Sequence, residues 1–258
     1  MAPEIVRGEA LPSTNTDLFS LTVLLFYLLI MHHPLDGKRE AAVHSLDLAA
    51  MEKLYGKEPV FIFDPHDDSN RPVPGIHDNA LIFWPIYPQF IRDLFTRSFT
   101  EGIKNIENGR VRESEWRISM VRLYDSIFYC STCGAENIYD IEGLKKTNGK
   151  PSPCWACKKA ITIPLRIRIG KNIVMLNHDT QIYHHHIDGS NGYDFSNAIA
   201  KVNRNPRSPQ IWGLKNLSNE KWTAKSKDKE KDIESGKSVP LLAGTKINFG
   251  KIEGEIRT

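Results

Sequence analysis

The chain has 258 residues, 40% of them hydrophobic and 25% charged, which is enough apolar material to form one large or two to three small domains. The formal net charge is only +3, and the basic excess looks slight and spread along the chain. Nucleic-acid binding depends on gathered positive charge, so the composition gives no reason to expect it.

The longest apolar run, residues 18–31, contains Ser20 and Thr22 and is shorter than the roughly 20 residues of a membrane-spanning helix. A buried core helix is the better prediction. No basic segment followed by an apolar stretch and a cleavage site stands at the N-terminus. We therefore expect a cytoplasmic protein without a membrane segment.

Residues 1–127 have the pattern of a helical domain. The first long helix is predicted to begin with Thr16 or Asp17 as its cap and to end before Pro34. Its apolar residues recur at helical spacing: Leu18, Leu21, Leu25, Leu28 and Leu29. Further helices are predicted over Glu40–Tyr55, Pro88–Glu101 and Arg112–Phe128.

Between the second and third of these helices lies Phe61–Pro85, which is rich in Pro, Asp and Asn. Such punctuation argues against a helix or a long strand. The acidic part, Phe61–Gly75, could be a packed loop or a docking surface, and the sequence does not distinguish the two.

Residues 128–160 hold all four cysteines, in the pairs Cys130-x2-Cys133 and Cys154-x2-Cys157. Twenty residues separate the pairs, at the upper edge of the spacing with which four thiolates hold a tetrahedral zinc ion. Disulfides fit poorly with a reducing compartment, and a redox dithiol is expected near a βαβ pattern, which is absent. The pattern predicts a structural zinc ribbon.

From residue 161 to residue 258, short runs alternate apolar and polar residues between Gly, Asn and Asp, which is typical of antiparallel β structure. The run Lys225–Glu234 mixes both charge signs and is predicted to be a solvated loop or hairpin tip. The strands are predicted at Leu165–Ile169, Ile173–Leu176, Gln181–Ile187, Ser238–Leu242 and Lys246–Phe249.

Three consecutive histidines, with His178 nearby, fall in one of these strands. On a strand, His184 and His186 would share a face and could chelate a metal. The alternative is that they form the polar face of a hairpin.

The first residues, Ala2-Pro3-Glu4, match the A-P-E motif that closes the activation segment of protein kinases. Downstream, Asp17-Leu18-Phe19-Ser20-Leu21-Thr22 resembles the kinase D-x-W-S-x-G helix, with Phe for Trp and Thr for Gly, and His33-Pro34-Leu35-Asp36-Gly37 resembles the turn after it. Arg110 with Glu115-Trp116 resembles the late R-P-x-x-x-E-W segment. The first half of the chain thus resembles the C-lobe of a bacterial serine/threonine protein kinase.

This resemblance implies a buried ion pair between Glu4 and Arg110. It also implies that the helix at Asp17 exposes an apolar face, because the helix that covers it in kinases precedes A-P-E. The ATP-binding and catalytic motifs precede A-P-E as well, so we expect these residues alone to be inactive and to act in docking. ATP and Mg²⁺ would bind only with a missing half, whether through a misplaced gene start or a natural split.

Three segments of the last region resemble the second half of a forkhead-associated β-sandwich: Trp212–Ser218, Gly236–Leu241 and Gly244–Gly250. Such domains read phosphothreonine, and the resemblance implies Ser218 and Asn219 as the contacts that can be placed. Ile169-Gly170-Lys171 carries lysine where the family has arginine, and no S-R-x-H follows.

The sequence therefore predicts an α+β multidomain chain with a partial kinase C-lobe (1–127), a four-cysteine zinc ribbon (128–160) and an antiparallel forkhead-associated-like β-sandwich (161–258). Protein partners are expected, among them a phosphoprotein or the missing kinase half. An active kinase completed by that half is one alternative. A zinc-dependent nucleic-acid adaptor is another, for which the candidate basic residues are Lys145, Lys146, Lys158 and Lys159.

Overall fold

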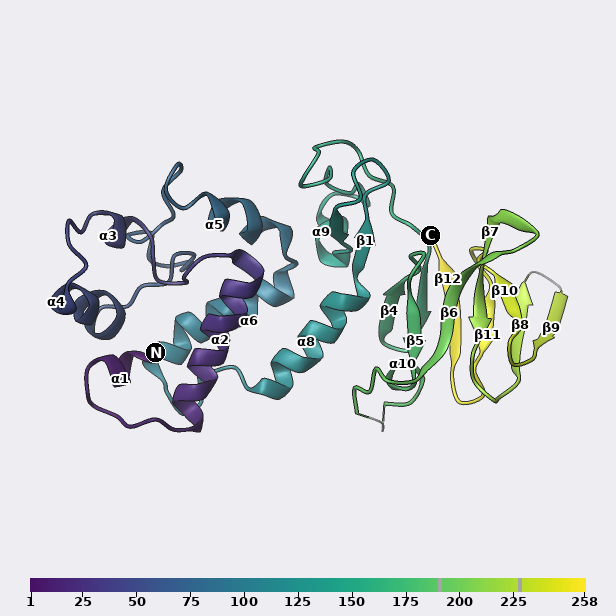
Figure 1. Cartoon of the computed structure of the whole chain (residues 1–258), viewed down its shortest axis with the longest axis horizontal. Coiled ribbons are helices and arrows are strands. Elements are labelled where there is room, and N and C mark those ends of the chain that lie inside the picture. The colour runs from purple at the N-terminus through teal and green to yellow at the C-terminus, as the bar shows by residue number, and fades with distance from the viewer. Residues whose placement is uncertain (190–191, 227–228) are drawn as a thin grey trace. The chain divides into compact units, whose positions relative to one another are not determined.

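The structure is a computed structural model that describes residues 1–189, 192–226 and 229–258 (Figure 1). It is an α+β protein that divides into two compact units, Met1–Met120 (unit 1) and Val121–Thr258 (unit 2). Unit 1 is helical, and unit 2 contains every strand of the described residues. None of the helices in the described ranges is long and apolar enough to cross a membrane.

Charge differs between the units, which corrects the expectation that it is spread evenly. Unit 1 carries 12 Lys and Arg against 17 Asp and Glu, whereas unit 2 carries 22 Lys and Arg against 14 Asp and Glu. The small net charge of the chain therefore hides an acidic unit and a basic unit.

Unit 1 consists of one long helix, α2, and a set of shorter elements. In chain order these are α1 (Pro3–Val6), α2 (Thr14–Ile30), α3 (Lys38–Ala41), α4 (Leu48–Met51), a π-helical turn (Glu52–Lys57), α5 (Asp78–Phe83), a 3-10 turn (Trp84–Ile86), α6 (Gln89–Phe99), α7 (Glu101–Lys104) and α8 (Glu113–Asp125), within which the units divide.

Helix α2 begins earlier than predicted, because Ser13 is its N-cap. The Ser13 hydroxyl accepts from the Thr16 backbone N–H, and the Thr16 hydroxyl accepts from the Ser13 backbone N–H. Each side chain thus satisfies the other residue's backbone donor. Asp17 lies inside the first turn and is exposed. The prediction that Thr16 or Asp17 caps the helix was therefore wrong.

Aromatic residues rather than leucines turn toward the core from α2. Phe26 is fully buried and meets Phe61, Phe95 and Phe99 with ring centroids 5.1 to 5.9 Å apart. These near-perpendicular contacts are a favourable aromatic geometry. The opposite face remains exposed, at 56% for Leu24, 47% for Tyr27, 67% for Leu28 and 58% for Met31.

Two of the predictions for unit 1 need correction. The segment Glu40–Tyr55 is not one helix, because it is divided among α3, α4 and the π-helical turn. Most of its side chains are not buried, so no continuous core face holds one helix together. The segment Phe61–Pro85 is irregular at first but ends in α5 and the 3-10 turn, which the sequence reading missed.

Unit 2 begins with a small hairpin and continues as an all-antiparallel β structure. Its elements are β1 (Ile127–Tyr129), β2 (Glu136–Ile138), α9 (Ile141–Lys146), β3 (Arg166–Ile169), β4 (Asn172–Met175), β5 (Gln181–Tyr183), α10 (His184–Ile187), β6 (Ala198–Asn205), β7 (Ser208–Asn216), β8 (Trp222–Ser226), β9 (Lys229–Ile233), β10 (Ser238–Pro240), β11 (Lys246–Asn248) and β12 (Glu253–Arg257).

Unit 2 contains two larger sheets (Figure 1), and their buried side chains form one core. One has the order β10-β7-β6-β5 and the other β4-β3-β12-β11-β8-β9. Buried residues of both sheets, such as Ile167, Leu214, Trp222, Phe249 and Ile256, belong to a single hydrophobic cluster. The sequence therefore folds as a two-sheet antiparallel sandwich.

Several strands of unit 2 differ from the sequence prediction, whereas the hairpin expected at Lys225–Glu234 is present. The predicted strand Gln181–Ile187 stops at Tyr183, and its histidines form the helical turn α10, so the shared strand face for His184 and His186 was wrong. The long strands β6 and β7 were not predicted. The run Lys225–Glu234 belongs to the β8–β9 hairpin, with residues 227–228 outside the described ranges.

Candidate functional site

Four cysteines converge on one point of unit 2 from two knuckles of the same shape. In the first knuckle, the Gly134 N–H donates to the Cys130 carbonyl at 2.9 Å, and in the second the Lys158 N–H donates to the Cys154 carbonyl at 2.9 Å. Gly134 and Lys158 both have positive φ, at 76° and 61°. Each knuckle thus turns its two sulfurs to the same side.

The sulfur positions fit a tetrahedral metal ion. The Sγ atoms of Cys130 and Cys157 lie 3.8 Å apart, those of Cys133 and Cys154 lie 3.7 Å apart, and all four lie within 4.8 Å of one another. A tetrahedron with metal–sulfur bonds of about 2.3 Å has edges of about 3.8 Å. A disulfide needs about 2.05 Å, so these are four free ligands around one centre.

Hydrogen bonds to sulfur favour the thiolate form at Cys130 and Cys154, whereas at Cys133 the Ala135 backbone N–H is outweighed by burial and the neighbouring thiols, which raise the pKa to about 11. The Thr132 N–H donates to Cys130 Sγ at 3.4 Å, and Asn137 Nδ2 donates to Cys154 Sγ at 3.6 Å. The pKa of Cys154 is lowered to about 6, first by the Cys157 backbone N–H. With four protein ligands, the centre has no open position for water and suits a structural ion.

The metal knuckles are tied to the sandwich inside unit 2. Phe128 and Tyr139 pack with Met175 in a small buried cluster, and Asn177 Nδ2 donates to the Ile127 carbonyl at 2.7 Å. The Tyr129 hydroxyl donates to an Asp179 carboxylate oxygen at 2.8 Å. Ordering of the knuckles by a metal would therefore also order the segment after β4.

In unit 1, the structure brings Glu4 and Arg110 together. Arg110 Nη1 lies 2.9 Å from Glu4 Oε1, Nη2 donates to Oε2 at 2.9 Å, and both side chains are at most 5% exposed. Arg110 also donates to the backbone carbonyls of Asn15 and Gly102. Burial raises the pKa of Glu4, but the bond and charge of Arg110 outweigh it and leave the pKa below its ordinary value.

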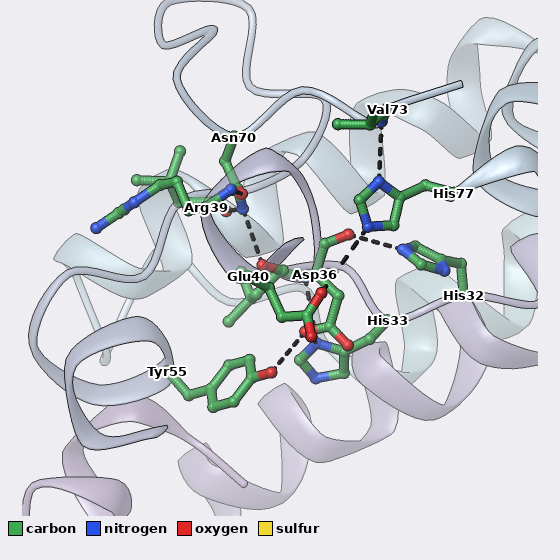
Figure 2. A network of polar contacts seen from close by, with 11 residues as sticks. His32, His33, Asp36, Arg39, Glu40, Tyr55, Asn70, Val73 and His77 are labelled. Atoms are coloured by element: carbon green, nitrogen blue, oxygen red, sulfur yellow. Dashed lines mark hydrogen bonds and ion pairs between the residues drawn. The ribbon is translucent and has the colours of Figure 1, made fainter. Parts of the chain in front are cut away.

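A second polar network lies after α2 (Figure 2), and the sequence analysis named two of its members, His33 and Asp36, only as parts of a turn. The Asp36 carboxylate accepts from the Tyr55 hydroxyl at 2.8 Å and contacts His33 Nδ1 at 2.9 Å, while His32 Nε2 lies 2.7 Å from the Asp36 carbonyl. Burial works to raise the pKa of Asp36, but His33 and Tyr55 lower it overall. The close spacing of His32, His33 and Asp36 was the available signal.

At the other side of Figure 2, His77 is 3% exposed and accepts a hydrogen bond on Nδ1 from the Val73 N–H at 2.9 Å. Its neutral ring then carries the proton on Nε2, which lies 3.9 Å from Glu40 Oε2. That nitrogen can donate but cannot ligate a metal. We therefore interpret this network as structural.

The remaining predicted residues do not form a site of their own. Ser218 Oγ donates to Asn216 Oδ1 at 2.7 Å, so it stabilises the β7–β8 turn, and Asn219 is exposed in that turn. Among the three histidines, His186 Nε2 lies 3.2 Å from the Asp125 carboxylate and both are buried. Burial raises the pKa of Asp125.

In comparisons with known proteins, no family model, no curated protein and no solved structure matches the chain. The structure by itself defines an α+β protein with a four-cysteine centre suited to a structural metal.

Proposed function

We propose that residues 1–127 are the C-terminal part of a serine/threonine protein kinase C-lobe and that this chain acts as a docking module rather than by phosphoryl transfer. The metal-bearing unit 2 would serve as the recognition part. The proposal places the protein in the cytoplasm. ATP and Mg²⁺ enter only if the residues that bind them are supplied from outside this sequence.

The observation that carries the proposal is the buried Glu4–Arg110 pair. The resemblance implies this pair between two residues more than 100 positions apart, and both side chains lie in it with a two-point contact. Burying an ion pair costs desolvation energy that largely offsets the attraction between its charges. General stability therefore does not account for the pair, and its presence is a specific point of agreement with the kinase resemblance. The apolar face of α2 that is exposed here is the face that a helix preceding A-P-E would cover in a kinase, as the resemblance implies.

We further propose that the four-cysteine centre holds zinc. Zinc accepts four thiolates in tetrahedral geometry and has no redox chemistry, which suits a structural role. Cys130, Cys133, Cys154 and Cys157 would hold the ion. We also propose that the sandwich has a forkhead-associated function. Two observations support it: the two-sheet architecture, and the position of Ser218 and Asn219 in a surface turn.

A direct test combines two measurements. Purified residues 1–258 with Mg-ATP and a general protein substrate should form no more ADP or phosphoprotein than a buffer control. The intact mass and N-terminal peptide of the endogenous protein then decide the setting. A start upstream that adds G-x-G-x-x-G, V-A-I-K and H-R-D motifs would make the protein an active kinase, and an upstream sequence without them would refute the kinase proposal. Phosphoryl transfer by the purified chain itself would refute the docking role.

One observation favours a second candidate, nucleic-acid binding by unit 2. The formal net charge of unit 2 is +8, compared with +3 for the whole chain. A duplex or single strand bound electrostatically would show affinity that falls steeply with salt. Filter binding with the double variant Lys158→Glu/Lys159→Glu tests it, since no change in the salt slope would exclude the ribbon lysines as phosphate contacts.

A further inference from the structure

Unit 2 contains a cavity of about 620 Å³ that the proposed function does not use. Five separate segments of the unit line it. Tyr129 and Ser131 contribute from the first cysteine knuckle, Leu165 from the segment before β3, Leu176 and His178 from the segment after β4, Trp212 from β7, and Leu242 from the segment after β10. Its size falls within the range of sites for small organic molecules, roughly 300 to 1,000 Å³.

The charge of the cavity differs from that of its surroundings. Unit 2 carries 36 residues of the types Lys, Arg, Asp and Glu, yet none of them is among the described residues that line the cavity. Two charges touch the lining and already have partners there: the Arg204 guanidinium lies 4.6 Å from the Trp212 ring centroid, and Asp179 accepts from the Tyr129 hydroxyl. A charged ligand would lose hydration in the cavity without meeting a charged side chain in the lining itself. The lining therefore selects an uncharged ligand.

The lining is apolar with a few polar groups, as ligand sites commonly are. Leu176 and Trp212 belong to or pack against the buried core of the sandwich, so this wall is rigid. Gln210 and His178 add hydrogen-bonding groups. Large apolar side chains stand open to solvent in the same lining, with Ile211 43% exposed and Leu242 55% exposed, and a bound apolar molecule would remove that surface from water.

We propose that this cavity binds a small, uncharged, largely apolar organic molecule, whose ring or aliphatic part packs between Trp212 and Leu242. Polar atoms on the molecule would meet Gln210 and His178. The inference is independent of the kinase proposal, because it uses unit 2 alone.

The four-cysteine centre adjoins this site, although none of its four cysteines is in the described lining. Tyr129 directly precedes the ligand Cys130, and Ser131 lies inside the Cys130–Cys133 knuckle. A metal that orders the knuckle would fix the wall that these two residues form. The binding experiment therefore uses the metal-loaded full chain.

The test titrates the metal-loaded chain with N-phenyl-1-naphthylamine, a neutral apolar fluorophore. We expect saturable binding with one site per chain. Leu242→Lys should weaken it at least tenfold, because the lysine brings a charge into the apolar lining. The matched control is Leu217→Lys, at a similarly exposed position in the β7–β8 turn outside the cavity, which should bind as the wild type does.

A second variant, Ile211→Lys, changes the cavity from a different strand and guards against a folding defect in the first. Amide NMR shifts provide the location, and we expect the largest shifts at Gln210, Ile211 and Trp212. Three results would each overturn the proposal: absence of saturable binding, binding by both cavity variants as tight as that of the wild type, or NMR shifts confined to other parts of the chain.

Discussion

Replacement of Arg110 by methionine should destabilise unit 1 by about 3–5 kcal/mol at pH 7, because it leaves the Glu4 carboxylate buried and without its partner. The pH dependence distinguishes this cause from loss of packing. In the wild type, the lowered pKa of Glu4 means that the pair stabilises the fold at neutral pH and that this contribution is lost as the pH falls through the lowered pKa. In the variant, Glu4 can become neutral as the pH falls, so the difference between the two proteins should shrink from pH 7 to pH 4.

The assay is urea unfolding followed by far-ultraviolet circular dichroism at 222 nm, because most of the described helical residues lie in unit 1. A double-mutant cycle with Glu4→Met supplies the control. The double variant should be more stable than the sum of the single losses predicts by at least about 1 kcal/mol, since it removes both charges together. Additive losses, or a difference that stays constant with pH, would refute the charge-pair reasoning.

Three further predictions concern unit 2. Cys157→Ser should abolish tetrahedral binding of one metal ion per chain, measured by elemental analysis and by the visible spectrum of the cobalt-substituted protein, and an unchanged spectrum would contradict the four-thiolate centre. Lys158 adopts the left-handed conformation that Gly134 adopts in the other knuckle. In urea unfolding, Lys158→Gly should therefore stabilise unit 2 by about 0.5–1 kcal/mol, and Gly134→Ala should destabilise it. The opposite order of stabilities would contradict the argument that the Lys158 backbone is strained. Burial and the neighbouring His186 lower the pKa of His185 to about 4, so the unfolded chain takes up a proton more readily, and stability should fall as the pH drops from 6.5 to 4. His185→Phe should flatten that slope, and an equally steep slope in this variant would show that other groups cause it.

The four-cysteine centre was predictable because its signal is local in the sequence. Two C-x2-C pairs fix the knuckles whatever surrounds them, and the sulfurs of Cys130 and Cys157 meet as the spacing implies. The approximate bounds of α6 and the hairpin nature of Lys225–Glu234 also followed from local patterns.

Predictions that depended on tertiary contacts did less well. Leucines marked the periodicity of α2, but Phe26 and its aromatic neighbours decided which face is buried. The histidines after Tyr183 read as a strand, yet the contacts of His186 with Tyr183 and Asp125 hold them in a helical turn. The cavity beside the ribbon brings together five distant segments, so no window of sequence could reveal it.

The side chain of Asn70 has a consequence for the chemical ageing of the protein. Its amide nitrogen donates to the carbonyls of Leu35 and Val60, and its oxygen accepts from the Arg39 N–H, so one buried amide joins three stretches of chain. Deamidation to aspartate would replace the donor by an acceptor that faces two carbonyl oxygens. The irregular segment would then lose its attachment through the conversion of a single nitrogen to oxygen, and the variant Asn70→Asp, which makes the same change, should show this loss as faster hydrogen exchange around Leu35 and Val60.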